Sequence, residues 1–191
     1  LAEQGVDVTV SYMRKLGREA PPGTKWSYKT GETNLIGVLV SSATKKNLSE
    51  YLSEKIWQPF GMELDASWML GPTGHEISGC CIQASTRDYA RFGLFILGGG
   101  IALGKPVLPD GWIAEATTTW AETNRPEYGY GYQWWTLKDG SYAARGIFGQ
   151  GIFIDPKRKL VIASNSNWPY ASDRQGGDQP VLLEVGSHRS R

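Results

Sequence analysis

The amino-acid sequence contains one Ser-x-x-Lys tetrad, Ser42 to Lys45, whose residue types could support nucleophilic chemistry. Residues three positions apart share one face of a helix, so a lysine there can keep the proton of the serine hydroxyl mobile while the serine attacks an acyl group. The tetrad stands in the polar stretch SSATKKN, and Lys46 and Asn47 follow it. This context is typical of a solvated helix exit, which is the favoured interpretation.

A tyrosine follows a Pro-Gly-Thr turn and precedes a helical segment. The stretch PGTKWSYKT occupies residues 22–30, with Tyr28 near its end, and the helical segment contains Asn34 to Gly37. Taken alone, Tyr28 would be an ordinary half-buried aromatic residue. A second notable stretch, ARGIFGQ at residues 144–150, is rich in glycine and runs into an apolar segment. Taken alone, it would be a strand whose glycines let a neighbour approach closely.

Three blocks together carry a resemblance to a known family. They are PGTKWSYKT, then STRDYARFG at residues 85–93, then ARGIFGQ, and they span most of residues 21–168. In type and order they resemble class C β-lactamases and the penicillin-binding-protein-like serine hydrolases. The form Gly-Ile-x-Gly-Gln stands where β-lactamases have Lys-Thr-Gly, and it is similar to 6-aminohexanoate-dimer hydrolases and β-lactamase-fold esterases.

The resemblance implies roles for particular residues. Tyr28 would shuttle a proton between nucleophile and leaving group, and the main-chain N–H of Ile147 would form half of the oxyanion hole. The residues expected to contact substrate are Gly146, Trp134, Trp135 and Trp168. In the family the Ser-x-x-Lys precedes the tyrosine block, so the nucleophile is expected in an N-terminal segment missing from this chain.

The implied function is hydrolysis through an acyl-enzyme. Carboxylic esters and small linear amides of the aminohexanoate-oligomer type are the expected substrates. β-Lactams are not favoured, because the missing Lys-Thr-Gly lysine helps to bind their carboxylate. This chain alone is expected to be inactive. The alternative is a non-catalytic binding or structural module, or an inactive fragment, with the β-lactamase fold.

Other catalytic centres and partners find little support. A Ser-His-Asp hydrolase needs a Gly-x-Ser-x-Gly elbow, which the sequence lacks. The histidines, His75 and His188, and the adjacent cysteines, Cys80 and Cys81, do not assemble four metal ligands, so neither metal nor cofactor is expected. Adjacent cysteines rarely bridge, which predicts small buried side chains here. A net charge of +1 disfavours a nucleic-acid partner. No apolar run reaches the roughly 18–20 residues that would span a membrane, and localisation stays open.

The elements that must position these residues follow from hydrophobic periodicity. Helices are expected at residues 6–16 and at residues 32–42. A third helix is expected after Asn47, which would be its N-cap, a fourth from residues 85–88 onward, and a fifth near residues 109–116. Strands are expected at 129–137, 142–154 and 159–165, joined by turns at 138–141 and 155–158. This order predicts an α+β fold. The resemblance makes it a β-lactamase/transpeptidase-like fold with a helical subdomain at 1–125, the C-terminal antiparallel strands of the sheet at 126–191, flanking helices, and an incomplete N-terminus.

Overall fold

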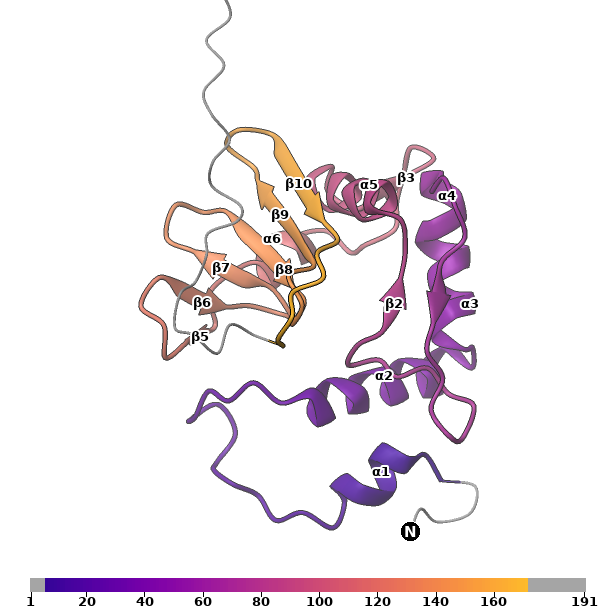
Figure 1. The fold of residues 1–191 in the computed structure, drawn as a ribbon, viewed down its shortest axis with the longest axis vertical. Helices are drawn as coiled ribbons and strands as arrows, with labels where there is room; N and C mark the ends of the chain where they lie inside the picture. The colour runs from indigo at the N-terminus through magenta and orange to yellow at the C-terminus, as the bar shows by residue number, and fades with distance from the viewer. Residues whose placement is uncertain (1–5, 172–191) are drawn as a thin grey trace, which may run out of the picture. The chain divides into compact units, whose positions relative to one another are not determined.

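The chain folds into two compact units. The computed structural model describes residues 6–171 (Figure 1). Of these residues, unit 1 comprises 6–85 with Ala102–Val107, and unit 2 comprises Thr86–Ile101 with 108–171. Within the described range no helix combines the length and the apolar character that a bilayer crossing requires. The subdomain boundary at residue 125 stays a prediction.

Unit 1 is mainly helical, and α2 is its longest element. Helix α1 packs against α2, and α2 packs against α3. From α3 onward three helical pieces follow one another directly, with a π-helical turn in the middle. Their bounds are α1 (Val8–Met13), α2 (Thr30–Thr44), α3 (Leu48–Leu52), η1 (Ser53–Trp57) and α4 (Gln58–Phe60).

The start of α3 differs from the expectation that the side chain of Asn47 caps it. Asn47 occupies the cap position, but its side chain makes no capping hydrogen bond. The Glu76 carboxylate instead accepts hydrogen bonds from the main-chain N–H groups of Leu48, at 3.3 Å, and Ser49, at 3.0 Å. A distant acidic residue thus satisfies the open N–H groups of this helix, where negative charge is favourable.

The chain segment before α5 (Thr86–Leu97) crosses α2 closely. It carries β1 (Ser67–Trp68) and β2 (Ile82–Gln83), which pair antiparallel. A Cβ atom at Gly37 of α2 would lie 2.1 Å from the Ser78 hydroxyl oxygen, so the crossing requires glycine. The cysteines that follow form a disulfide, and Cys80 is exposed. The prediction of two small buried side chains was therefore wrong.

Unit 2 is built on a six-stranded antiparallel sheet in the order β10-β9-β8-β7-β6-β5 (Figure 1). Each strand pairs with its neighbour in sequence. Helix α5 packs on β9 and β10, and Gly93 allows the approach, since a Cβ there would lie 2.5 Å from Val161 Cγ1. The strands are β5 (Ala121–Glu122), β6 (Tyr128–Tyr130), β7 (Trp135–Leu137), β8 (Tyr142–Arg145), β9 (Gly151–Asp155) and β10 (Leu160–Ser164). The helices of this unit are α5 (Thr86–Leu97) and α6 (Trp112–Ala116). The hairpin of β3 (Ile101–Ala102) with β4 (Lys105–Pro106) belongs to unit 1 from Ala102 onward.

Two segments that were each expected to form one strand each form two. The segment 129–137 reverses after β6, where the Gly131 N–H donates to the Trp134 carbonyl at 2.8 Å and Gln133 has a φ of 64°. The segment 142–154 reverses after β8, where the Gly146 N–H donates to the Gln150 carbonyl at 2.7 Å. Apolar residues continue through both reversals, so composition alone does not mark them. The glycines do, because they permit tight backbone turns.

One part of the core of unit 2 lies between α5 and one face of the sheet, and Ala143 and Phe153 are buried on the other face. Ile152 and Ile154 of β9 point toward α5 together with Val161, its neighbour on β10. Burying such side chains is the main favourable contribution to folding, about 1.5–3 kcal/mol for each large one. The most buried hydrophobic residues of the unit are Phe95, Ile96, Ala116, Tyr142, Ala143, Ile152, Phe153 and Ile154.

Candidate active site

The hairpin between β8 and β9 holds the glycine-rich motif in a defined turn. The Gly146 N–H donates to the Gln150 carbonyl at 2.7 Å, and the Phe148 N–H donates to the Gln150 side-chain oxygen at 3.0 Å. Gly149 has a φ of 83°, which glycine adopts without strain. One glutamine therefore accepts from the amides on both sides of Ile147.

Ile147 presents a main-chain donor at this turn. Among residues 6–171, its N–H group has no hydrogen-bond acceptor, and the residue is 56% exposed. An amide without a protein acceptor can bind a negatively charged oxygen, and a fixed donor of this kind typically lowers a reaction barrier by about 3 kcal/mol. The Ile147 N–H is therefore available as a donor at this turn, and its part in an oxyanion hole stays a prediction.

Trp168 supports the same hairpin from the segment after β10. The main-chain N–H of Trp168 donates to the Phe148 carbonyl at 3.2 Å. Its indole lies so close to Gly149 that a Cβ there would meet Trp168 Cε2 at 2.3 Å. The Ser164 hydroxyl also donates to the Gly149 carbonyl, at 3.1 Å. The structure therefore brings Gly146, Ile147 and Trp168 together.

The other two tryptophans lie on β7 or just before it. Trp134 is only 9% exposed and packs edge-on against Tyr142, with ring centroids 5.3 Å apart. Trp135 is half-buried and contacts the rings of Tyr128 and Tyr130 at 6.0 and 5.0 Å. Both therefore make structural contacts within unit 2, and their part in substrate binding stays a prediction.

Tyr28 lies two residues before α2 in unit 1, whereas Ile147 belongs to unit 2. The tyrosine is 53% exposed. Its segment is held by Glu19, whose carboxylate binds Lys25 and Lys29 on either side of it. Hydrogen bonds from both lysines lower the pKa of Glu19 to about 2, and the hydrogen bond to Glu19 raises the pKa of Lys29. A cation is thus fixed next to Tyr28 in the sequence at neutral pH.

The Ser42–Lys45 tetrad does not form a catalytic pair. Helix α2 ends at Thr44, and Lys45 has a φ of 58°, in the left-handed region. Its side chain therefore leaves the helical face on which a residue three positions after Ser42 would lie. Both residues are exposed. This geometry agrees with the interpretation as a helix exit.

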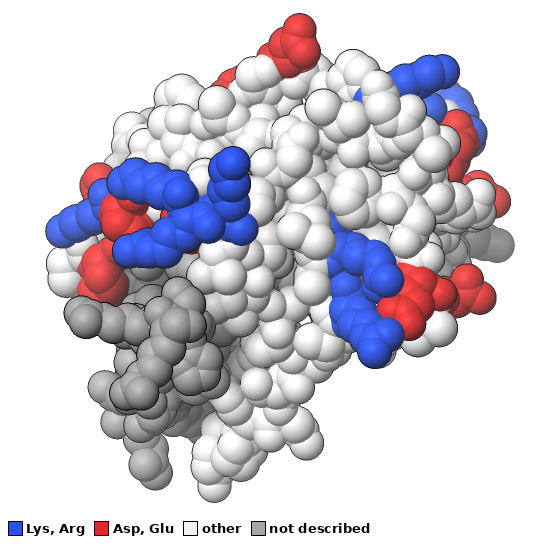
Figure 2. All heavy atoms as spheres, turned by 90° about the horizontal axis from the view of Figure 1, so that it is seen from above, with Lys and Arg blue, Asp and Glu red and all other residues white. Residues whose placement is uncertain are grey.

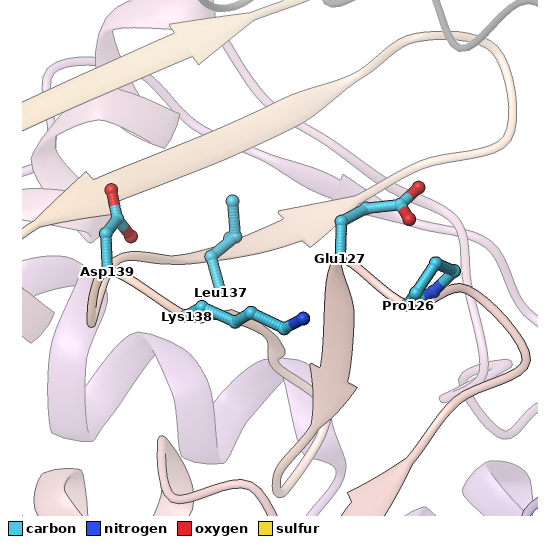
Figure 3. Close-up of a pocket in the computed structure, with 5 residues that line it drawn as sticks. All are labelled: Pro126, Glu127, Leu137, Lys138 and Asp139. Carbon is cyan, nitrogen blue, oxygen red and sulfur yellow. The ribbon is translucent and has the colours of Figure 1, made fainter.

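A surface depression lies at the opposite end of β8 from the hairpin of Ile147. Its volume is about 440 Å³, and Figure 3 shows its side chains spread around it without converging on one point. None of the predicted site residues lines it. The lining residues are Pro126, Glu127, Leu137, Lys138 and Asp139.

The charged side chains of the described residues lie mainly in local groups of opposite sign. Across residues 6–171 no three His, Cys, Asp or Glu side chains are grouped as metal ligands. Figure 2 shows basic side chains beside acidic ones on the face in view, with wide uncharged areas between these groups. The ion pairs of Glu19 with Lys25 and of Lys46 with Glu54 are of this local kind.

Sequence reasoning missed two residues that shape the candidate site. Gln150 sets the hairpin through both its side chain and its carbonyl, and its place at the end of the glycine-rich motif was the available signal. Glu19 holds the segment of Tyr28. Nothing in its surroundings distinguished it from other surface glutamates.

Comparisons with known proteins show what this chain is similar to. It is 30% identical over 174 residues to the 6-aminohexanoate-dimer hydrolase of Paenarthrobacter ureafaciens, and the match covers 84% of this chain and 44% of that protein. The structure of a candidate 6-aminohexanoate-dimer hydrolase from Bacillus anthracis matches with a TM-score of 0.75 and 30% identity, covering 86% of this chain and 44% of that one. The chain thus spans less than half the length of these relatives.

More distant structures share the fold. A penicillin-binding protein homologue from Caulobacter crescentus matches with a TM-score of 0.69 at 17% identity, over 84% of this chain and 57% of that one. The fold is therefore β-lactamase/transpeptidase-like, as predicted. The family model named Beta-lactamase matches residues 2–186. The resemblance in the three sequence blocks is confirmed, and the chain belongs to the β-lactamase family.

Proposed function

We propose that this chain supplies part of the active site of a serine hydrolase that acts through an acyl-enzyme on carboxylic esters or small linear amides. The observation that carries the proposal is the Ile147 N–H, which has no acceptor among residues 6–171 and lies between two amides that donate to Gln150. This donor would bind the oxygen that becomes negative when a nucleophile attacks the carbonyl carbon.

Tyr28 would move the proton in this reaction. It would take the proton from the attacking hydroxyl and deliver it to the leaving alkoxide or amine. The serine nucleophile and its lysine would come from a Ser-x-x-Lys segment outside this chain, because Ser42 and Lys45 do not share a helix face here. The stretches that resemble the family's tyrosine and oxyanion blocks, by contrast, both stand in this sequence.

The substrate class is proposed from the motif and the relatives together. The form Gly-Ile-x-Gly-Gln at residues 146–150 stands in the stretch that resembles the Lys-Thr-Gly strand of β-lactamases, so a β-lactam carboxylate would lack its lysine partner. The relative from Paenarthrobacter ureafaciens is named a 6-aminohexanoate-dimer hydrolase. Another structural match is titled EstCE1, a hydrolase with promiscuous acyltransferase activity. Linear amides and esters are accordingly the substrates to test first.

The test compares two tyrosine variants of the full-length gene product. Tyr28→Phe is expected to lower kcat for p-nitrophenyl acetate and for an aminohexanoate dimer by about 10²–10⁴-fold. Tyr12→Phe, an exposed tyrosine of the same unit, serves as the control and should leave both rates unchanged. Unchanged rates in Tyr28→Phe would refute the proton-transfer role.

A serine-directed fluorophosphonate probe tests the nucleophile separately. Labelling of a serine outside this chain is the expected result. Labelling of Ser42 would contradict the proposed location, and no labelling at all would favour a non-catalytic module with this fold.

A further inference from the structure

The adjacent cysteines lie at an accessible bend in unit 1. Cys80 and Cys81 are bonded to each other, Cys80 is exposed and Cys81 is half-buried. Cys81 has a φ of 83°, in the left-handed region, which residues with a side chain rarely adopt. The bend therefore has an uncommon backbone conformation at a position that thiols in solution can reach.

The backbone around this bend is tightly held in its present conformation. The Trp68 indole N–H lies 3.0 Å from the carbonyl oxygens of both Ile77 and Cys80. The Met69 N–H donates to the Cys81 carbonyl at 3.1 Å. A rotation of the backbone at Cys81 would turn that carbonyl away and break this last bond.

The bend is also joined to the start of α2. The N–H of Gly79, immediately before the cysteines, donates to the Asn34 side-chain oxygen at 2.5 Å. A Cβ at Gly79 would lie 2.6 Å from Thr30 Cγ2, so the backbone there touches the first turn of the helix. A change of backbone conformation at Cys80 and Cys81 would consequently reach α2 through Gly79.

We propose that Cys80 and Cys81 form a reversible thiol–disulfide switch that sets the backbone conformation beside the first turn of α2. In the oxidised form the ring that contains both cysteines holds Cys81 in the left-handed region. A small dithiol reduces the S–S bond by attack and exchange: two electrons and two protons pass to the pair, two thiols form, and the reductant becomes a cyclic disulfide. Cys81 then relaxes to a negative φ.

The reverse step needs a disulfide oxidant such as oxidised glutathione. One cysteine thiolate attacks it and forms a mixed disulfide with release of one glutathione thiol. The second cysteine then displaces the other glutathione and closes the Cys80–Cys81 bond. The exposure of Cys80 makes it the residue for the intermolecular step.

The first experiment counts thiols in this chain under denaturing conditions. After treatment with oxidised glutathione we expect no free thiol, and after reduction with dithiothreitol we expect two. Two free thiols in the glutathione-treated chain, or a stable mixed disulfide in place of closure, would overturn the switch.

The second experiment measures amide hydrogen exchange in both redox states. The Met69 amide, which bonds to Cys81, is expected to exchange at least about tenfold faster after reduction. The Tyr51 amide, which donates to Asn47 within the same unit, should not change. Equal exchange at Met69 in both states would show that the disulfide does not control this backbone.

Two variants distinguish the effect of the Cys80–Cys81 disulfide from the effect of the backbone conformation at Cys81. Cys81→Ser should resemble the reduced chain, with fast exchange at Met69. Cys81→Gly also lacks the disulfide, but glycine occupies a φ of 83° readily and should keep Met69 protected. If the Met69 amide exchanges at the same rate in both variants, the left-handed conformation at residue 81 does not protect it, and the proposed role of the disulfide is refuted.

An effect on catalysis rests on the proposed function, since α2 begins two residues after Tyr28. Reduction of the full-length protein would then lower kcat without a large change in KM. Failure of the thiol and exchange experiments refutes the switch. Absence of hydrolysis in both redox states, with those experiments positive, refutes only the proposed function.

Discussion

The packing of Trp168 on Gly149 can be tested by one added methyl group. In Gly149→Ala the new Cβ would lie 2.3 Å from Trp168 Cε2 and 2.8 Å from Ser166 Cβ. Two effects then destabilise unit 2. A side chain at a φ of 83° costs about 1–2 kcal/mol, and overpacking against the indole costs about 1–3 kcal/mol more. The expected total is about 2–5 kcal/mol.

Gly111→Ala separates the two effects. Gly111 has a φ of 79°, also lies in unit 2, and has no atom within 4 Å of its would-be Cβ. This variant carries only the backbone penalty of about 1–2 kcal/mol. The free-energy difference between the two variants therefore reports the contact with Trp168 alone.

Native-state hydrogen exchange of the β9 amides is the assay, because these amides report on unit 2 directly. A difference of about 1–3 kcal/mol corresponds to exchange about 5- to 150-fold faster in Gly149→Ala than in Gly111→Ala. Adding Trp168→Ala should remove most of this difference, since it removes the clashing ring. Equal exchange in the two alanine variants would mean that the indole does not pack on the hairpin.

Three further predictions concern other contacts. Gly93→Ala should lower the thermal midpoint, with a loss of about 1 kcal/mol despite the better helix propensity of alanine, because the methyl meets Val161. In a Val161→Ala background the same added methyl should cost less. Glu76→Gln should destabilise α3 by about 1 kcal/mol at neutral pH. Burial raises the pKa of Glu76, but hydrogen bonds from Ser49 and Leu48 outweigh it and keep the pKa below 4.5, so wild type and variant should converge in thermal unfolding as the pH falls below that value. Under the proposed function, Gln150→Ala should lower kcat of the full-length protein by about tenfold at unchanged KM, because Ile147 loses its fixed orientation; a tenfold rise in KM at unchanged kcat would contradict this role.

The fold could be predicted because its signals are local and ordered. The motif STRDYARFG marks the start of α5, and the Asp-Gly turn before β8 has Gly140 at a φ of 89°, as such turns require. The three blocks in sequence identified the family before any geometry was known. These features depend on neighbours along the chain, which a sequence displays directly.

What could not be predicted depends on residues far apart. Glu76 caps a helix that begins 28 residues earlier, and no local pattern points to that pairing. The reversals at Gly131 and Gly146 were hidden inside apolar runs that continue through them. At the candidate site, the sequence indicated Ile147, but only the structure shows that Gln150 accepts from the amides on both sides of it.

The order of the sheet strands has a consequence for how unit 2 folds. Because β5 to β10 pair only with their neighbours in sequence, every hairpin can close over a short loop, and the sheet has low contact order. Closing such hairpins takes about 1–10 μs each. The longest-range event is the docking of α5 on β9 and β10, more than 50 residues later in the chain. The turn that presents Ile147 would therefore form early and locally, and the helix would fix the sheet afterwards.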